Sequence, residues 1–221
     1  MWAVHNATPY PSERTWVRDK EGQHHWIVAV KATFDVSPSG KVALSDDQEQ
    51  PLLAPEYLGE PGLSSLLHDA DLVASKPTTD ILLIGKAYTP KGRTVRKLNV
   101  SLRVGSVFKD LGVFGTRVYR AGVMGVTLSK PTEFKTRDMT YEWSYGGADL
   151  SDPDPRKHVL DRRNPVGRGV ASNAQRLLDL PAHSIEYPRG HPATMGPAGF
   201  GPIASHWSPR LELAGTYDET W

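Results

Sequence analysis

The sequence predicts a mainly β protein. Its expected core is an antiparallel β-sandwich or barrel-like sheet, covered by a long Pro/Gly-rich coat with at most one or two short helices. Several segments alternate apolar and polar residues with the period of two that is typical of a half-buried strand. Turn residues separate these segments at short intervals. The chain holds 20 Gly and 18 Pro residues, 38 of 221 in all. We expect one domain over residues 1–221, with core strands at about 24–147 and 211–214 and the irregular coat at 148–210.

The clearest predicted strand covers residues 26–36. Its even-numbered residues, from Trp26 to Val36, are all apolar, so we expect them to face the core. Residues 37–40 (Ser-Pro-Ser-Gly) predict a turn, and residues 41–44 can return as a hairpin partner. The acidic, Pro-rich stretch 45–79 is expected to run over the surface, with one helical turn near 64–68.

Further strands are expected at residues 80–88, 98–104, 107–114, 117–119, 126–128 and 139–145. The first is apolar on both faces at its beginning, which favours a central strand covered on both sides. The second alternates apolar residues with Lys97, Asn99, Ser101 and Arg103, which predicts a basic outer face. Gly105-Ser106 then predicts a tight turn. Trp26 and Trp143 lie in predicted strands and are expected in the core.

The coat, residues 148–210, is rich in Pro, Gly, Asp and Arg. Ser172–Gln175 fits a capping box that opens a short helix, which Pro181 ends. A segment this long without periodicity either wraps the sheet as an ordered layer or becomes ordered on a partner. Leu211–Leu213 predicts one more strand.

Charge is unevenly distributed along the chain. Residues 1–75 contain 5 basic and 11 acidic residues and carry a net charge of −6. Residues 76–137 contain 13 basic and 3 acidic residues, a net charge of +10, and residues 138–221 contain 8 basic and 11 acidic residues, a net charge of −3. The basic middle is neutralised within the fold, or it offers a face to an acidic partner or to nucleic acid. The chain has no Cys, which excludes disulfides, thiolate metal sites and a Cys nucleophile, and fits a reducing, cytoplasmic location.

Motifs for catalysis and metal binding are weak. No G-x-S-x-G or phosphate-binding loop is present, and the Gly-rich run 196–201 contains prolines that lack amide donors. His183, His191 and His206 in the coat could converge with Asp residues as a hydrolase site, but no zinc-binding spacing supports this. The basic strands lack the interleaved aromatic residues of a nucleic-acid surface. We therefore expect no catalytic residue, no metal and no cofactor.

Aromatic residues and one Arg gather near the C-terminus: Trp207, Arg210, Tyr217 and Trp221. Such clusters in irregular segments are typical of protein interfaces, because they bury a large area at little rotamer cost. The alternative is that they seal the coat against the sheet.

Several strings, taken in order, resemble one bacterial family. They are Val30–Phe34, Ser75–Asp80, Ile84–Tyr88, Val104-Gly105 with Lys109, Tyr141–Gly147, Asn164–Gly169 (Asn-Pro-Val-Gly-Arg-Gly), Leu180-Pro181 with Ile185-Glu186, Pro197–Ile203 (Pro-Ala-Gly-Phe-Gly-Pro-Ile), Trp207, Pro209-Arg210 and Gly215–Asp218. This pattern resembles the domain of unknown function family twenty-one sixty-nine, whose members are encoded with type VI secretion genes. The resemblance implies an adaptor or chaperone that helps to load effectors, often with a PAAR-like tip domain, onto the secretion spike. Relatives continue past the Gly-Thr-Tyr-Asp block, so this chain is either truncated or a short member.

We expect, on this basis, a non-catalytic protein whose partners are an effector and a PAAR-like or spike protein, with no nucleic acid and no membrane involved. The expected partner contacts are Trp207, Arg210, Tyr217 and Trp221, with Arg103 and Lys109 as secondary contacts. Four further residues are expected to fix the conformation of the coat: Asn164, Arg168, Gly199 and Gly201. The alternatives are a hydrolase with converging His and Asp residues in the coat and, less favoured, a nucleic-acid-binding module.

Overall fold

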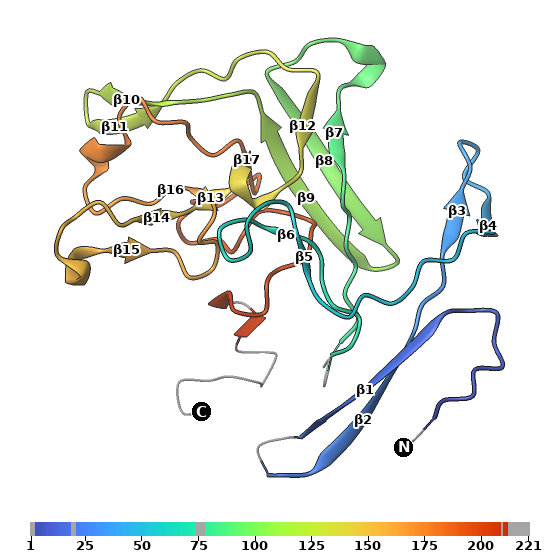
Figure 1. Ribbon diagram of the computed structural model, residues 1–221. Coiled ribbons are helices and arrows are strands. Elements are labelled where there is room, and N and C mark those ends of the chain that lie inside the picture. Colours follow the sequence, from blue (N-terminus) through green and yellow to red (C-terminus); the bar gives the residue numbers. More distant parts are fainter. Residues whose placement is uncertain (1–2, 19–20, 74–77, 209, 212–221) are drawn as a thin grey trace. The chain divides into compact units, whose positions relative to one another are not determined.

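The computed structural model describes residues 3–18, 21–73, 78–208 and 210–211 (Figure 1). It confirms the mainly β class, with mostly antiparallel strand pairs and one short parallel pair among the described residues. Among the described residues no sheet closes into a barrel. The chain divides into two compact units. Unit 1 is Met1–Glu56 with His68–Pro77, and unit 2 is Tyr57–Leu67 with Thr78–Trp221. That both belong to one domain stays a prediction.

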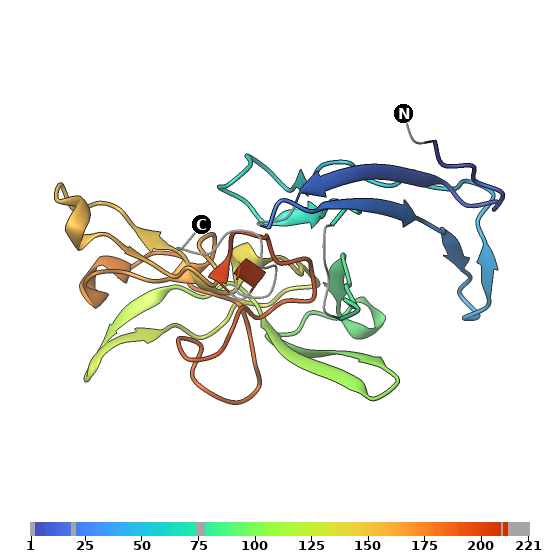
Figure 2. The same cartoon turned by 90° about the horizontal axis from the view of Figure 1, so that it is seen from below.

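Unit 1 is built from two hairpins. Their strands are β1 (Ser12–Arg18), β2 (His24–Val30), β3 (Phe34–Val36) and β4 (Val42–Leu44). Figure 2 shows β1 and β2 as one long two-stranded ribbon. The hairpin at residues 34–44 is confirmed, and Gly40 supplies the positive φ of 80° that its turn requires. The expected strand 26–36 is interrupted at residues 31–33. There the Gln48 side chain bonds to the backbone N–H and C=O of Thr33, and the same C=O also accepts from Ser45 N–H.

The expected core face of β2 is wrong. Trp26, Val28 and Val30 are between 49 and 58% exposed, whereas Ile27 and Ala29 on the opposite face are partly covered. Alternation identifies the two faces of a strand, but a second layer decides which of them is buried. Among the described residues of unit 1, only Pro51 is buried.

Two expected elements between residues 56 and 88 are also wrong. The helical turn near 64–68 is a strand, because β5 (Glu56–Tyr57) pairs with β6 (Leu66–His68) and Leu58 N–H bonds to Ser65 C=O. The expected strand 80–88 is reduced to β7 (Lys86–Tyr88), which pairs only with β12 (Thr136–Asp138). Ile81–Ile84 are irregular and exposed, so this apolar run is not a buried central strand.

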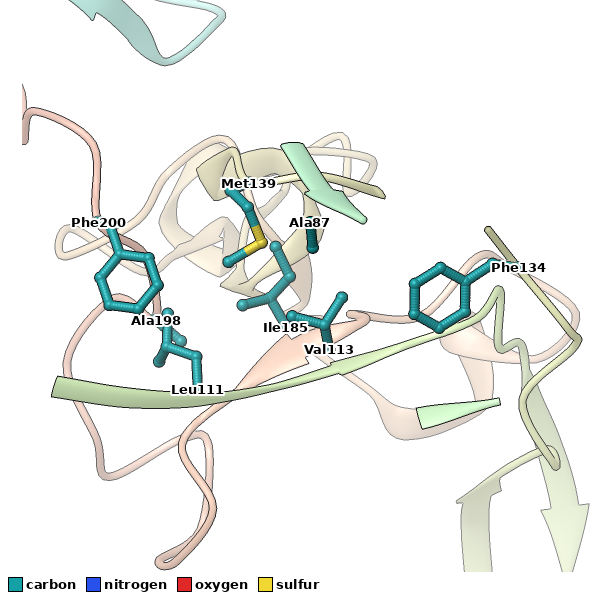
Figure 3. Close-up of a cluster of buried hydrophobic side chains, with 8 residues drawn as sticks. All are labelled: Ala87, Leu111, Val113, Phe134, Met139, Ile185, Ala198 and Phe200. Atoms are coloured by element: carbon teal, nitrogen blue, oxygen red, sulfur yellow. The ribbon is translucent and has the colours of Figure 1, made fainter. Parts of the chain in front are cut away.

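The main sheet of unit 2 has the order β17 (Ile185–Glu186), β9 (Val107–Phe114), β8 (Lys97–Val104). The β8–β9 hairpin is confirmed, including the Gly105-Ser106 turn. Its inner face carries Leu111 and Val113, which are fully buried, and they pair with the inner residues of β8. Figure 3 shows the resulting core gathered on one side of β9. Its members are Ala87, Leu111, Val113, Phe134, Met139, Ile185, Ala198 and Phe200.

A second core cluster contains Leu66, Tyr141, Ala204 and Trp207. It depends on a 3₁₀ turn, η2 (Tyr141–Trp143), which replaces the strand expected at 139–145. The N–H groups of Trp143 and Ser144 bond back to Thr140 and Tyr141, so the chain turns here and buries the Tyr141 ring.

The remaining elements of unit 2 are short. The strands are β10 (Tyr119–Gly122), β11 (Gly125–Leu128), β13 (Tyr145–Gly146), β14 (Ala148–Asp149), β15 (Val159–Leu160) and β16 (Arg168–Gly169). The 3₁₀ turns are η1 (Pro90–Gly92), η3 (Pro155–Lys157) and η4 (Ala174–Leu177). In the coat, Asn173 rather than Ser172 caps η4, because Ser172 bonds to Asp149. Leu211 N–H bonds to Trp207 C=O, so the chain forms a helical turn here and not the strand expected at residues 211–214. Residues 212–214 lie outside the described residues.

Candidate functional site

Three of the segments that carry the resemblance meet at one place in unit 2, here called the motif junction: residues 141–147, 164–169 and 197–203. The buried Asn164 amide donates to Tyr141 C=O (3.0 Å) and Tyr145 C=O (2.9 Å). Beside it, β13 and β16 pair in parallel, with Tyr145 opposite Arg168 and Gly146 opposite Gly169. Asn164 and the backbone of Arg168 thus lie where a coat-fixing role requires them.

The loop 197–201 is held by five consecutive carbonyl groups, each of which accepts a hydrogen bond. The donors are Tyr187 OH to Pro197 (3.1 Å), Ser144 Oγ to Ala198, Lys109 Nζ to Gly199 (2.5 Å), Leu83 N–H to Phe200 (2.9 Å) and Tyr141 OH to Gly201 (2.8 Å). A Cβ atom on Gly199 would overlap the Tyr141 ring, so this position requires glycine, whereas a Cβ on Gly201 would meet the same ring at an ordinary 3.9 Å. Side chains from several segments therefore fix the loop in one conformation.

Trp207 is 1% exposed, and its ring packs edge-on against Tyr141 with the ring centres 5.4 Å apart. A side chain so enclosed has no surface to offer a partner, and its position favours the alternative interpretation that it seals the coat. Arg210 donates to Ile203 C=O at 2.9 Å. Tyr217 and Trp221 lie outside the described residues, so their expected contact role stays a prediction.

The two secondary contact residues differ in position. Lys109 lies on the inner face of β9 with Leu111, because residues two apart share a face, and its ammonium group lies over the Tyr187 and Phe200 rings. Burial lowers the pKa of Lys109. Lys109 therefore does not share the basic outer face with Arg103, where a contact residue was expected. Arg103 does lie on the outer face, is exposed, and stacks on Phe108 with 5.0 Å from Cζ to the ring centre.

A buried polar cluster surrounds His183, one of the three coat histidines. Its Nε2 lies 3.2 Å from Glu186 and its Nδ1 lies 3.1 Å from Tyr119 OH. Arg117 donates both to Glu186 (3.0 Å) and to His183 C=O (2.8 Å). Burial raises the pKa of Tyr119 to about 12. His183 is 5% exposed, and Arg117 holds its carboxylate partner. This cluster therefore ties the chain at 183–186 to residues 117–119.

His191 and His206 are exposed, and no hydrogen bond or ion pair joins either of them to His183 in the described part of the chain. Within that part, no three His, Asp or Glu side chains are grouped so as to hold a metal ion. No described helix has the length and apolar character needed to cross a membrane.

An exposed aromatic surface lies in unit 1, on the face of β1–β2 that we call the tryptophan face. It consists of four cross-strand pairs: Ser12–Val30, Arg14–Val28, Trp16–Trp26 and Arg18–His24. Trp16 and Trp26 are both about half exposed. Trp16 stacks on His24 with the ring centres 5.1 Å apart, and Arg18 bonds to the same imidazole at 2.9 Å.

Sequence reasoning missed this surface, although its signal is present. Residues 14, 16 and 18 read Arg, Trp and Arg at a spacing of two, which places them on one face of a strand. Trp and Arg are the residues most enriched at protein interfaces. The same combination was recognised near the C-terminus only.

The sequence profile of a family described as "Uncharacterized protein conserved in bacteria" (DUF2169) matches residues 21–221. No curated protein and no solved structure matches the chain.

Proposed function

Because the chain belongs to the DUF2169 family of bacterial proteins, we propose that it is a non-catalytic adaptor of the type VI secretion system. It binds an effector in the bacterial cytoplasm, one that is PAAR-like or fused to a PAAR-like domain, and helps to load this effector onto the secretion spike. The link to secretion rests on the sequence resemblance, and the binding role is supported by the surface of unit 1.

The observation that carries the proposal is the uncovered tryptophan face. Two-stranded ribbons are marginally stable in water unless one face packs against another layer. Unit 1 has only Pro51 buried among its described residues, while Trp16, Trp26, Val28 and Val30 remain about half exposed. Contiguous exposed apolar surface of this kind marks interaction sites in soluble proteins.

The composition of the face also fits a protein partner. Two adjacent Trp rings supply a large apolar area at low entropic cost, and Arg14 and Arg18 flank them on β1. An acidic client would be steered towards these guanidinium groups, and towards Arg103 at the outer face of β8. We therefore assign the main client contact to the tryptophan face and a secondary contact to the Arg103–Phe108 pair.

The test is co-purification from cells that express this chain together with the effector genes beside it. Trp16→Ala with Trp26→Ala should abolish recovery of the effector, while circular dichroism and unit 2 stability remain unchanged. Tyr88→Ala removes an aromatic side chain that is 66% exposed in unit 2 and serves as the matched control, which should retain the effector. Equal recovery by the double variant and the control would refute the contact assignment. Recovery of no neighbouring effector by the unaltered chain would refute the adaptor role.

A hydrolase is the second candidate, and the contact between His183 and Glu186 favours it. Its test is turnover of ester, amide and phosphoester substrates by the purified protein. Hydrolysis that is lost in His183→Gln, with the fold retained, would replace the adaptor proposal.

A further inference from the structure

Two arginine side chains lie against one indole ring at the surface of the motif junction. Trp143 lies in η2, Arg137 on β12 and Arg168 on β16. The Cζ atom of Arg137 is 4.2 Å from the centre of the Trp143 ring, and that of Arg168 is 4.0 Å from it. All three side chains are partly buried, so each still reaches solvent.

Neither guanidinium group forms an ion pair with a described residue, and the neighbouring carboxylates are engaged elsewhere. Asp138 pairs with Lys86 at 3.0 Å. Glu142 accepts bonds from Ser65 N–H (2.7 Å) and Ser65 Oγ (2.9 Å).

The hydrogen-bonding capacity of the two groups is also largely unused. Arg137 donates to Thr116 Oγ1 through Nη2 at 3.3 Å, while its buried Nε–H has no hydrogen-bond partner among the described residues. The guanidinium group of Arg168 makes no hydrogen bond to a described residue. A guanidinium group carries five N–H donors in a planar fork suited to carboxylate and phosphate oxygens.

Other covered arginines of unit 2 behave differently. Arg163 forms a fork with Asp161 at 2.8 and 2.9 Å, and Arg117 pairs with Glu186 at 3.0 Å. These pairs follow the usual rule that covered charges are compensated by an opposite charge. Arg137 and Arg168 depart from it, since the Trp143 ring offers only a cation–π contact.

The electrostatic consequence is an excess of positive charge at a partly desolvated position. Burial lowers the pKa of Arg137 and of Arg168, and Arg168 lowers that of Arg137 further. The charges of Asp138 and Glu142 oppose this lowering of the Arg137 and Arg168 pKa values, respectively, without reversing it. An oxyanion bound beside the ring would compensate this positive charge and accept free guanidinium N–H groups.

We propose that Arg137, Trp143 and Arg168 form a binding site for an oxyanion, supplied either by an Asp or Glu side chain of a partner polypeptide or by inorganic phosphate. The site is distinct from the tryptophan face and stands independently of the adaptor role. It gives Arg168 a ligand-binding role, whereas the parallel pairing of β16 needs only its backbone.

The experiment is an NMR titration of the ¹⁵N-labelled full chain, following the indole N–H of Trp143, assigned with Trp143→Phe, and the arginine Nε–H groups. One arm adds sodium phosphate and the other a blocked tetrapeptide that contains Glu, each against sodium chloride at equal ionic strength. We expect saturable shifts of the Trp143 signal that chloride does not cause. The anion that saturates at the lower concentration identifies the source.

Arg168→Gln and Arg137→Gln should each weaken this binding by about tenfold or more, because one of two charged donors is lost. Using both variants keeps the test valid if one fails to fold, which the amide spectrum reveals. Arg156→Gln, at an exposed arginine paired with Asp154, is the control and should bind as the unaltered chain does. The absence of saturable shifts with both anions would overturn the proposal, as would unchanged binding in folded Arg168→Gln or Arg137→Gln.

Discussion

Replacing Trp207 by Ala tests whether this residue supports the fold or contacts a partner. The side chain is 1% exposed and packs with Tyr141, Leu66 and Ala204, all buried. Truncation of an enclosed aromatic residue removes its transfer free energy and leaves a cavity, which typically costs about 3–5 kcal/mol. For a chain of this size, each kcal/mol lost from the free energy of unfolding lowers the melting temperature by about 2–4 °C. We therefore expect the melting temperature to fall by about 6–20 °C.

The assay is urea denaturation followed by circular dichroism, with the change read from the midpoint at constant slope. Trp16→Ala is the control, because Trp16 is 53% exposed and its removal should change the free energy of unfolding by about 0.5 kcal/mol or less. If Trp207→Ala cost less than about 1 kcal/mol while effector binding was lost, the burial argument would be refuted. Trp207 would then be the contact residue that the sequence predicts.

Three further outcomes follow from the same contacts. Gly199→Ala should lower stability by about 1–3 kcal/mol in urea denaturation, because the methyl group would overlap a ring, whereas Gly196→Ala, with nothing within 4 Å, should be nearly neutral. Burial raises the pKa of Glu186, but hydrogen bonds and charge from His183 and Arg117 outweigh this and hold it below 4.5. The stability that the Glu186 carboxylate contributes is thus complete above pH 4.5 and is lost as the pH falls below 4.5. Urea midpoints measured between pH 7 and 3 should therefore fall less steeply for Glu186→Gln than for the unaltered chain. Burial raises the pKa of Tyr119 from 10.0 to about 12, so stability should decline as the pH rises through this range. Tyrosinate absorbance should show late ionisation, because burial also raises the pKa of Tyr141, Tyr145 and Tyr187, and Tyr119→Phe should remove one tyrosine from this late component.

The sequence predicts the β8–β9 hairpin well because the information is local. The alternation in residues 98–102 and the Gly105-Ser106 turn together determine both the register and the buried face. The strand period of two places Lys109 on the same face as Leu111 and Val113, so its inward position was predictable. A basic residue was nevertheless expected on the outer face. Errors of this kind arise when residue type is weighed above register.

The apolar runs at 80–88 and 139–145 were mispredicted for a different reason. An apolar run shows that side chains avoid water, but it does not show which backbone conformation delivers them to the core. At Tyr141 a 3₁₀ turn buries the ring against Trp207, and the donor from Asn164 that satisfies the Tyr141 carbonyl lies 23 residues along the chain. Partners so distant in sequence cannot be identified from one stretch of residues.

The tryptophan face shows why an exposed surface can escape prediction. Alternation in residues 26–30 correctly separates two faces, and the apolar one was assigned to the core because buried apolar faces are the rule. In unit 1 the rule fails because the described residues supply no second layer to cover Trp26. An exception to a packing rule is itself informative, since contiguous exposed apolar surface marks interaction sites in soluble proteins.

The residues that carry the family resemblance are mostly engaged in contacts within the chain. Asn164 caps two carbonyl groups of the motif junction, Gly199 admits the Tyr141 ring, and Trp207 fills the cluster behind it. The motifs therefore describe how the scaffold closes and leave its partner chemistry undefined. Under the proposed function, a client would be recognised where side chains have exposed area or uncompensated charge, as they do at the tryptophan face and beside Trp143. Because one surface is apolar and aromatic and the other cationic, they offer two chemically distinct contacts on separate units of the chain.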